Sequence, residues 1–212
     1  MSFLKQKEAP AALAQPENKM NRIPSQKHIC YGICFYGGIF LLIDIEYDRA
    51  AAVRYADKWA YFRNPEFYDF SEIGGDCTNF ASQCLLAGGA VMNYTPTFGW
   101  YYTGVNDRAP SWTGVKYLFN FLTTNEGIGP YGTQVEPSAI MPGDLCQLIL
   151  DGEDWQHTPI IVSVDGGRAT YENIRVAAHS YDCNCRPLSS YRISSARFIH
   201  IEGVRTLSGE EN

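Results

Sequence analysis

The chain has 212 residues and a formal net charge of −6, with 45% hydrophobic and 14% aromatic residues. This length and composition fit one folded domain with an apolar core, and they exclude an intrinsically disordered chain. Because the sequence contains no run of Lys and Arg, we expect no nucleic-acid partner. The seven cysteines show no metal-ligand spacing, so we expect neither a metal ion nor another cofactor.

The first 46 residues differ in character from the rest of the chain. Residues 1–28 are polar and proline-containing without helical or strand periodicity, which is typical of a flexible leader. Residues 29–43, ICYGICFYGGIFLLI, carry no charge. This run is short for a membrane-spanning helix and resembles the apolar part of a secretory signal, with packed strands as an alternative. It slightly favours a secreted or membrane-anchored protein with membrane contact through residues 29–43, and a cytoplasmic location is the alternative.

Three helices are predicted next in the chain. Residues 47–64 place apolar and charged side chains on opposite sides, and Pro65 ends this amphipathic helix. The second helix begins at Cys77 and closes at the glycines 88 and 89. The third covers residues 111–125 with Ser111 as its N-cap.

From residue 141 onward the pattern predicts short strands separated by turns. The expected strands lie in the segments LCQLIL, HTPIIVSV, ATYENIRVAAH and ARFIHI. Helices followed by an antiparallel meander indicate an α+β fold in which N-terminal helices pack on an antiparallel β-sheet. We therefore expect a domain over residues 47–205, preceded by the leader of residues 1–46 and followed by a tail of residues 206–212.

Cys77 stands at the expected N-terminus of the second helix, directly after Gly74, Gly75 and Asp76. Unpaired backbone N–H groups and the positive end of the helix dipole favour a thiolate there. The glycines permit a tight turn and the close approach of a substrate, and Asp76 is expected to cap the helix. Cys84, further along the same helical face, is expected to be a packing residue.

A nucleophilic cysteine needs a base, and the chain has four histidines. His157 opens a strand directly after a polar turn, so we predict that it is the general base. His179 ends the next strand and is predicted to orient His157 through a ring nitrogen, with an ordinary strand-end role as the alternative. A metal site of His179, Cys183 and Cys185 is disfavoured, because the spacing of the two cysteines suits tetrahedral zinc poorly.

Several segments resemble the bacterial putative amidase domain family, which is related to papain-like cysteine hydrolases of cell walls, of the CHAP and NlpC type. The likeness runs from about Tyr47 to about Ile201 and is carried in order by YDRAAAVRYADKWA, NPEFYDF, GGDCTNFASQCLLAGG, GWYY, SWTGV, MPGDL, HTPIIVSV and AAHSYD. The resemblance implies a papain-like fold with Cys77 as nucleophile and His157 as base. It also implies a third polar residue, for which His179 is the first candidate and Asp182 the fallback.

The residues and the resemblance together predict a cysteine-dependent hydrolase of amide or peptide bonds that works through a thioester acyl-enzyme. The expected partner is a peptide or amide substrate, such as peptidoglycan. Asp76, Trp100, Tyr101 and Trp112 are expected at the oxyanion hole or along the substrate cleft, with core packing as the alternative for the aromatic side chains. The alternative function is a non-catalytic papain-like module that binds peptide or glycan.

Overall fold

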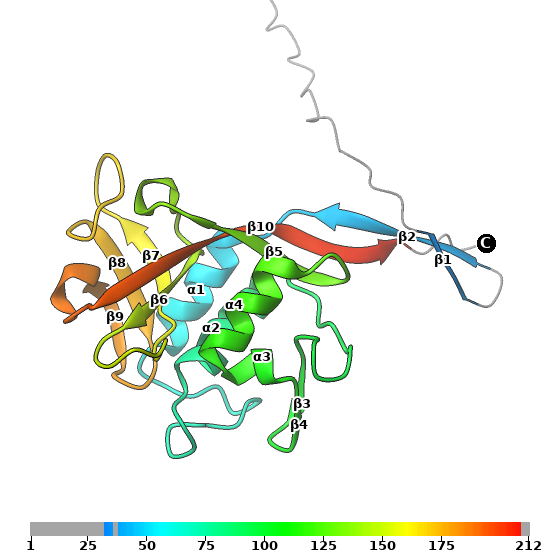
Figure 1. Ribbon diagram of the computed structural model, residues 1–212, viewed down its shortest axis with the longest axis horizontal. Coiled ribbons are helices and arrows are strands. Elements are labelled where there is room, and N and C mark those ends of the chain that lie inside the picture. Colours follow the sequence, from blue (N-terminus) through cyan, green and yellow to red (C-terminus); the bar gives the residue numbers. More distant parts are fainter. Residues whose placement is uncertain (1–31, 36–37, 209–212) are drawn as a thin grey trace, which may run out of the picture.

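The computed structural model describes residues 32–35 and 38–208, and it is an α+β protein (Figure 1), which confirms the predicted class. The helices are α1 (Arg49–Trp59), α2 (Cys77–Ala87), α3 (Pro110–Thr113) and α4 (Val115–Thr124), with short 3-10 turns η1 (Pro137–Ala139) and η2 (Leu188–Ser190). The strands are β1 (Gly32–Phe35), β2 (Gly38–Ile45), β3 (Tyr102–Gly104), β4 (Asp107–Arg108), β5 (Gly129–Val135), β6 (Leu145–Ile149), β7 (Ile160–Val164), β8 (Ile174–Ala178), β9 (Cys183–Pro187) and β10 (Ser195–Ser208).

One eight-stranded sheet organises the domain, with the strand order β1-β2-β10-β6-β7-β8-β9 and β5 paired to β10. All of its pairings are antiparallel. Strands β6 to β9 are neighbours in both sequence and space, so the meander is confirmed for the first three of its four predicted strands. The fourth predicted strand, ARFIHI in β10, pairs with β6 instead of following β8, whose neighbour is β9. The strands β3 and β4 form a separate two-stranded sheet.

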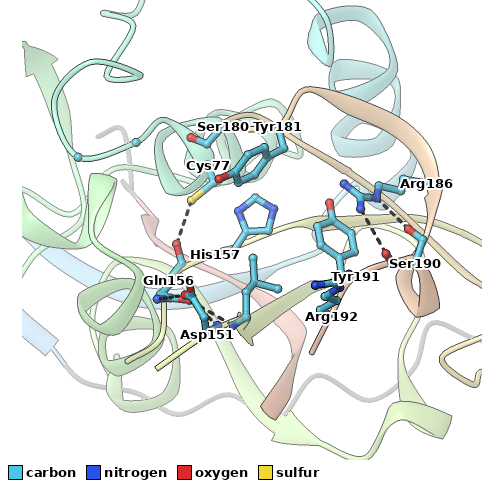
Figure 2. Close-up of a pocket in the computed structure, with 13 residues that line it drawn as sticks. Cys77, Asp151, Gln156, His157, Ser180, Tyr181, Arg186, Ser190, Tyr191 and Arg192 are labelled. Carbon is cyan, nitrogen blue, oxygen red and sulfur yellow. Dashed lines mark hydrogen bonds between the residues drawn. The ribbon is translucent and has the colours of Figure 1, made fainter. Parts of the chain in front are cut away.

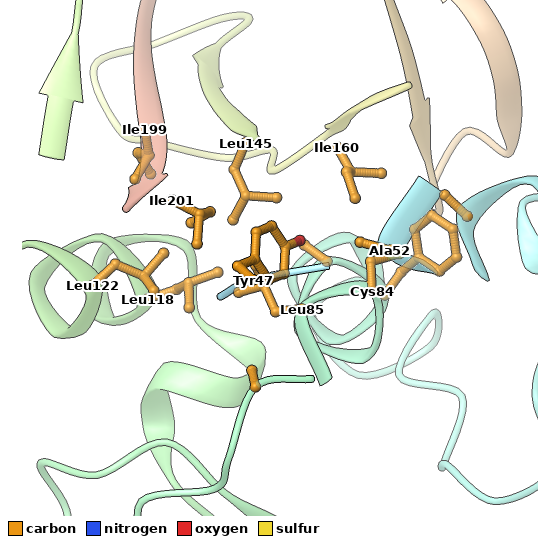
Figure 3. Close-up of a cluster of buried hydrophobic side chains, with 14 of the residues drawn as sticks. Tyr47, Ala52, Cys84, Leu85, Leu118, Leu122, Leu145, Ile160, Ile199 and Ile201 are labelled. Atoms are coloured by element: carbon orange, nitrogen blue, oxygen red, sulfur yellow. The ribbon is translucent and has the colours of Figure 1, made fainter. Parts of the chain in front are cut away.

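The central strands are apolar on both faces because each face is covered. Successive side chains of a strand point to opposite faces, and Leu145 and Ile160 join the cluster between the sheet and the helices. Their neighbours Cys146 and Ile161 join a second cluster on the other face. Figure 3 shows how side chains from the helices and the sheet meet in the first cluster.

Helix α2 lies in the middle of the helical layer, and nine of its residues are buried. Four of these nine are polar, and each has a partner: Thr78 contacts Thr158, Asn79 accepts from Trp112 Nε1, Ser82 accepts from Trp100 Nε1, and Gln83 accepts from Tyr55. Buried polar groups that are fully hydrogen-bonded fix one arrangement of their neighbours. The helix that carries Cys77 is therefore fixed by hydrogen bonds to α1, to the segment before β7 and to two buried tryptophans.

Two helix boundaries differ from the prediction. Helix α1 ends at Trp59, well before Pro65, and Ala60 is its C-cap. The third predicted helix is divided at Gly114, whose backbone is extended (φ −108°, ψ 122°). Ser111 is therefore not its N-cap: it lies inside α3, where its hydroxyl donates to the Gly99 carbonyl at 2.5 Å. The sequence also gave no prediction of β5 or β9.

The apolar segment of residues 29–43 is described only in part. Residues 38–45 form β2, which pairs with the C-terminal half of β10, and Figure 1 shows these two strands running together away from the helices. The predicted leader, residues 1–28, lies outside the described residues. Within residues 32–35 and 38–208, no helix has both the length and the apolar character that crossing a bilayer requires.

The downstream Asp144, part of the segment MPGDL, is a structural residue. It is fully buried and accepts hydrogen bonds from the backbone N–H groups of Met141 and Ile201. It also contacts Arg49 and the Nδ1 atom of His200. Asp144 thus joins the start of α1 to β6 and β10.

Candidate active site

Two glycines build the turn that leads into Cys77. Gly74 and Gly75 have φ angles of +86° and +102°, which favour glycine strongly, so the prediction of a glycine-dependent turn is confirmed. The next residue, Asp76, donates its backbone N–H to Ser180 Oγ at 2.7 Å. A Cβ atom on Gly75 would lie 3.3 Å from that hydroxyl. The turn therefore packs closely against the loop after β8.

Cys77 is the first residue of α2, as predicted, and its side chain is 5% exposed. Its Sγ lies 3.8 Å from the Gln156 carbonyl, to which the thiol donates, and 3.8 Å from Thr78 Oγ1. The backbone N–H of a first helical residue has no acceptor inside its helix. Burial raises the pKa of the Cys77 thiol above its ordinary value of 9.0, so the resting group is a neutral thiol.

His157 lies just before β7 and forms an isolated antiparallel bridge with Leu148 of β6, in which the Leu148 N–H donates to the His157 carbonyl at 3.0 Å. Pro159 cannot donate to the ladder, and the regular strand starts only at Ile160. The next residue after His157, Thr158, has its hydroxyl 3.1 Å from that of Thr78. This bond ties the first turn of α2 to the segment that carries His157.

The His157 ring is 3% exposed, and its Nε2 atom is buried without a hydrogen-bond partner among the described residues. Burial, and then the positive charge of Arg186, lower the pKa of His157 to about 4. The imidazole is therefore neutral near pH 7 and can accept a proton. Within the described part of the chain, no hydrogen bond joins His157 to Cys77 at rest.

Cys77 and His157 line the same pocket, which has a volume of about 710 Å³ (Figure 2). This volume lies within the range of small-molecule sites. Tyr181, Arg186, Tyr191 and Arg192 are further parts of its wall. Sequence reasoning missed Arg186, Tyr191 and Arg192, because β9 and the turn after it carry no motif that marks them.

His179 does not orient His157, so the predicted contact between the two rings is wrong. Its Nδ1 lies 2.6 Å from Asp76 Oδ2, its Nε2 lies 2.9 Å from the Trp59 carbonyl, and its ring stacks on Phe80 with centroids 3.9 Å apart. A carbonyl only accepts, so Nε2 donates to Trp59. His179 is thereby fully occupied in tying α1 to the start of α2.

Asp76 is fully buried and does not line the pocket, contrary to its expected place in the oxyanion hole or cleft. It occupies the N-cap position but makes no side-chain cap. Its Oδ1 accepts instead from the Phe70 N–H at 2.9 Å and from Asn79 Nδ2 at 2.8 Å. Counting His179 Nδ1 at 2.6 Å from Oδ2, the Asp76 carboxyl group has three polar contacts, and it links the loop before α2, the first turn of α2 and the end of β8.

The remaining candidates also lie away from the pocket. Asp182, the fallback third residue, pairs with Arg63 through two contacts of 3.0 Å. Trp100 and Trp112 are fully buried, and Tyr101 packs near Tyr94 with ring centroids 5.3 Å apart. None of the three aromatic residues lines the pocket of Cys77, so the alternative of core packing holds for the two tryptophans. Cys84 is fully buried in the core, which confirms its packing role.

Comparison with known proteins finds one family and one curated relative. A family model described as a putative amidase domain matches residues 46–201. The uncharacterized protein YhbB of Bacillus subtilis (strain 168) is 36% identical over 155 residues, which cover 71% of this chain and 47% of YhbB. The chain thus spans about half the length of that relative. No solved structure matches this chain significantly.

Proposed function

Because the chain belongs to the putative amidase domain family, which indicates an amide hydrolase in general, we propose that it cleaves an amide or peptide bond with Cys77 as nucleophile. One observation carries the cysteine chemistry. Cys77 and His157 come from two different elements, a hydrogen bond between Thr78 and Thr158 ties these elements together, and both side chains face one pocket.

The first half of the proposed reaction starts from a neutral thiol and a neutral imidazole. The Cys77 sulfur attacks the amide carbonyl carbon while a ring nitrogen of His157 takes the thiol proton. We propose the backbone N–H of Cys77, which has no acceptor inside its helix, as a donor to the oxyanion that forms; one such donor commonly lowers the barrier by about 2.7 to 4 kcal/mol. His157 then gives its proton to the amine nitrogen, the C–N bond breaks, and a thioester remains on Cys77.

The second half releases the acyl group. A water molecule gives a proton to His157 and attacks the thioester carbonyl, after which the carbon–sulfur bond breaks and Cys77 takes the proton back. The products are a carboxylic acid and an amine. Because the imidazole must be neutral to accept each proton, the lowered pKa of His157 keeps it in the active form near neutral pH.

We propose that Cys77 and His157 act as a dyad. Among the described residues, the buried Nε2 of His157 has no polar partner. The ring is held instead by its backbone bridge to Leu148 and by Tyr191, whose ring centroid lies 5.7 Å away at an angle of 45°. Within the described residues, His179 makes no hydrogen bond to either member of the dyad. In this proposal it is a positioning residue, because its contact with Asp76 fixes the start of α2.

The papain-like fold and the cell-wall peptide substrate remain predictions that rest on the resemblance. In support of the first, the nucleophile begins a buried helix and the base precedes a strand of an antiparallel sheet. The alternative function, a non-catalytic module that binds peptide or glycan, draws support from the raised pKa of Cys77, since a reactive cysteine commonly has a lowered one.

A cleavage assay tests the proposal. The purified protein is incubated with muropeptides and simple acylated amides, and the products are identified by mass. We expect cleavage by the wild type, cleavage by Cys84→Ala, which removes a buried thiol of the same helix outside the pocket, and no cleavage by Cys77→Ala. Full activity of a folded Cys77→Ala protein would overturn the proposal. Binding without cleavage, equal for wild type and Cys77→Ala, would establish the alternative.

A further inference from the structure

Two arginines face the pocket of Cys77 and His157: Arg186 on β9, and Arg192 just after η2 (Figure 2). We propose that they bind a carboxylate on the leaving-amine side of the scissile bond, so that the preferred substrate is an acylated amino acid with a free carboxylate. This inference rests on the proposed function and adds the substrate class.

Neither arginine has a carboxylate partner among the described residues, whereas Arg49, Arg63, Arg175 and Arg205 each pair with an aspartate. Within residues 32–35 and 38–208, Arg186 donates only to Ser190, from Nε to the hydroxyl at 2.8 Å and from Nη2 to the carbonyl at 3.4 Å. Its Nη1 atom makes no hydrogen bond within the described part of the chain, and the side chain lines the pocket. A guanidinium presents its N–H groups in a planar fork that matches a carboxylate.

The Arg186 guanidinium is also fixed in place before any ligand binds. Its central carbon lies 3.8 Å from the centroid of the Tyr191 ring, which is a cation–π arrangement. The contacts to Ser190 hold its other end. A group that is held in its binding geometry loses less entropy when a ligand arrives, which favours affinity.

The charge of the pocket wall is positive on the side of these arginines. Asp151 is the only carboxylate among the lining residues, and it accepts from Gln156 Nε2 at 2.7 Å. Figure 2 shows it beside Gln156, away from Arg186. An anionic substrate group is therefore attracted to the end of the pocket formed by Arg186 and Arg192.

The position of His157 assigns this end to the leaving amine. The ring of Tyr191 lies between His157 and Arg186, and Figure 2 shows Cys77 on the opposite side of His157. The amine nitrogen must lie next to His157 to receive its proton. Atoms attached to that nitrogen continue beyond His157, toward the arginines, while the acyl group stays on the side of Cys77.

Alkylation of Cys77 tests the anion site without needing turnover. Iodoacetate and iodoacetamide differ in charge and are attacked by the same thiolate, so the thiolate fraction cancels in the ratio of the iodoacetate to the iodoacetamide rate constant. We expect this ratio, measured by mass spectrometry on the peptide with Cys77, to exceed that of N-acetylcysteine by about tenfold, because the positive end of the pocket raises the local concentration of the anionic reagent. It should fall toward the free-thiol value in Arg192→Gln and Arg186→Gln, and in 1 M salt.

The control is Arg54→Gln, which removes the same charge from an exposed position on α1 outside the pocket and should leave the ratio unchanged. Because Arg192 is exposed, its variant keeps the test valid if Arg186→Gln fails to fold. An equal ratio in wild type and Arg192→Gln would overturn the anion site. A Cys77 that iodoacetamide does not alkylate would instead refute the proposed function, and with it the inference.

Paired substrates test the leaving-amine side. Acylated amino acids are offered as free acids and as the matching carboxamides. We expect wild type to cleave the acids with about tenfold higher kcat/KM, and Arg192→Gln to lose that preference while still cleaving the carboxamides. Equal kcat/KM for acid and carboxamide, with cleavage that still depends on Cys77, would refute the inference and leave the proposed function standing.

Discussion

Because His157 is buried, its imidazole is harder to protonate in the folded chain than in the unfolded chain. The stability of the fold should therefore depend on pH. The pKa of His157 falls from 6.5 to about 4 on folding, so between these values the unfolded chain binds more protons than the folded one. Stability is therefore fully present above pH 6.5 and is lost as the pH falls. Because each pKa unit corresponds to about 1.4 kcal/mol, the loss is about 1.4 kcal/mol at pH 5.5 and about 3 kcal/mol at pH 4.

Urea unfolding of wild type and His157→Gln at pH 7, 5.5 and 4 isolates this contribution. The wild type should lose about 3 kcal/mol more than the variant between pH 7 and pH 4, since other titrating groups are common to both. Cys77→Ala is the control from the same pocket, because a thiol with a raised pKa does not titrate in this range. A difference between wild type and His157→Gln that stays constant from pH 7 to pH 4 would refute the assignment of a buried, neutral imidazole.

Three further outcomes are expected. In the pH profile of kcat/KM, the acid limb should have its midpoint near pH 4, because His157 is inactive as a base only when it is protonated. A midpoint near pH 6.5 would show that the ring is solvated. Asp76→Ala should destabilise the fold by about 2 to 6 kcal/mol in urea unfolding, since it removes the buried acceptor of the Phe70 N–H and of Asn79 Nδ2, at about 1 to 3 kcal/mol for each donor; a loss below 1 kcal/mol would contradict these contacts. Gly88→Ala should cost about 1 to 3 kcal/mol, because its Cβ would lie 2.2 Å from the Tyr47 ring, and an unchanged midpoint would contradict that packing.

The local sequence was sufficient to predict how Cys77 is presented. Gly74 and Gly75 before a helix start, and a positive φ at Gly89 after its end, are signals that act over a few residues. The position of His157 at the end of a polar turn was equally local. Both side chains reach the same pocket, although the regular strand after His157 starts three residues later than predicted, at Ile160.

Long-range partners could not be predicted in the same way. From the sequence alone, Trp100 and Trp112 fit a substrate cleft and a core equally well. The structure decides for the core, because their indole N–H groups donate to the buried side chains of Ser82 and Asn79 on α2. His179 was placed correctly at the end of a strand, but its partner Asp76 lies 103 positions earlier in the chain. Pairings over such separations depend on the packing of whole elements, which residue types do not specify.

The helix of the nucleophile and the opposite wall of the pocket differ in how freely they can evolve. A change in the buried polar residues of α2 breaks a hydrogen bond in the core. The wall from Cys183 to Arg192 supplies Arg186 and Arg192 from a segment that is largely at the surface. New substrate preferences can therefore arise by exchange of the exposed positions of this segment. A graft of residues 183–192 from a homologue, with Tyr191 kept because it packs on His157, is a direct route to redesigning selectivity while Cys77 and His157 stay intact.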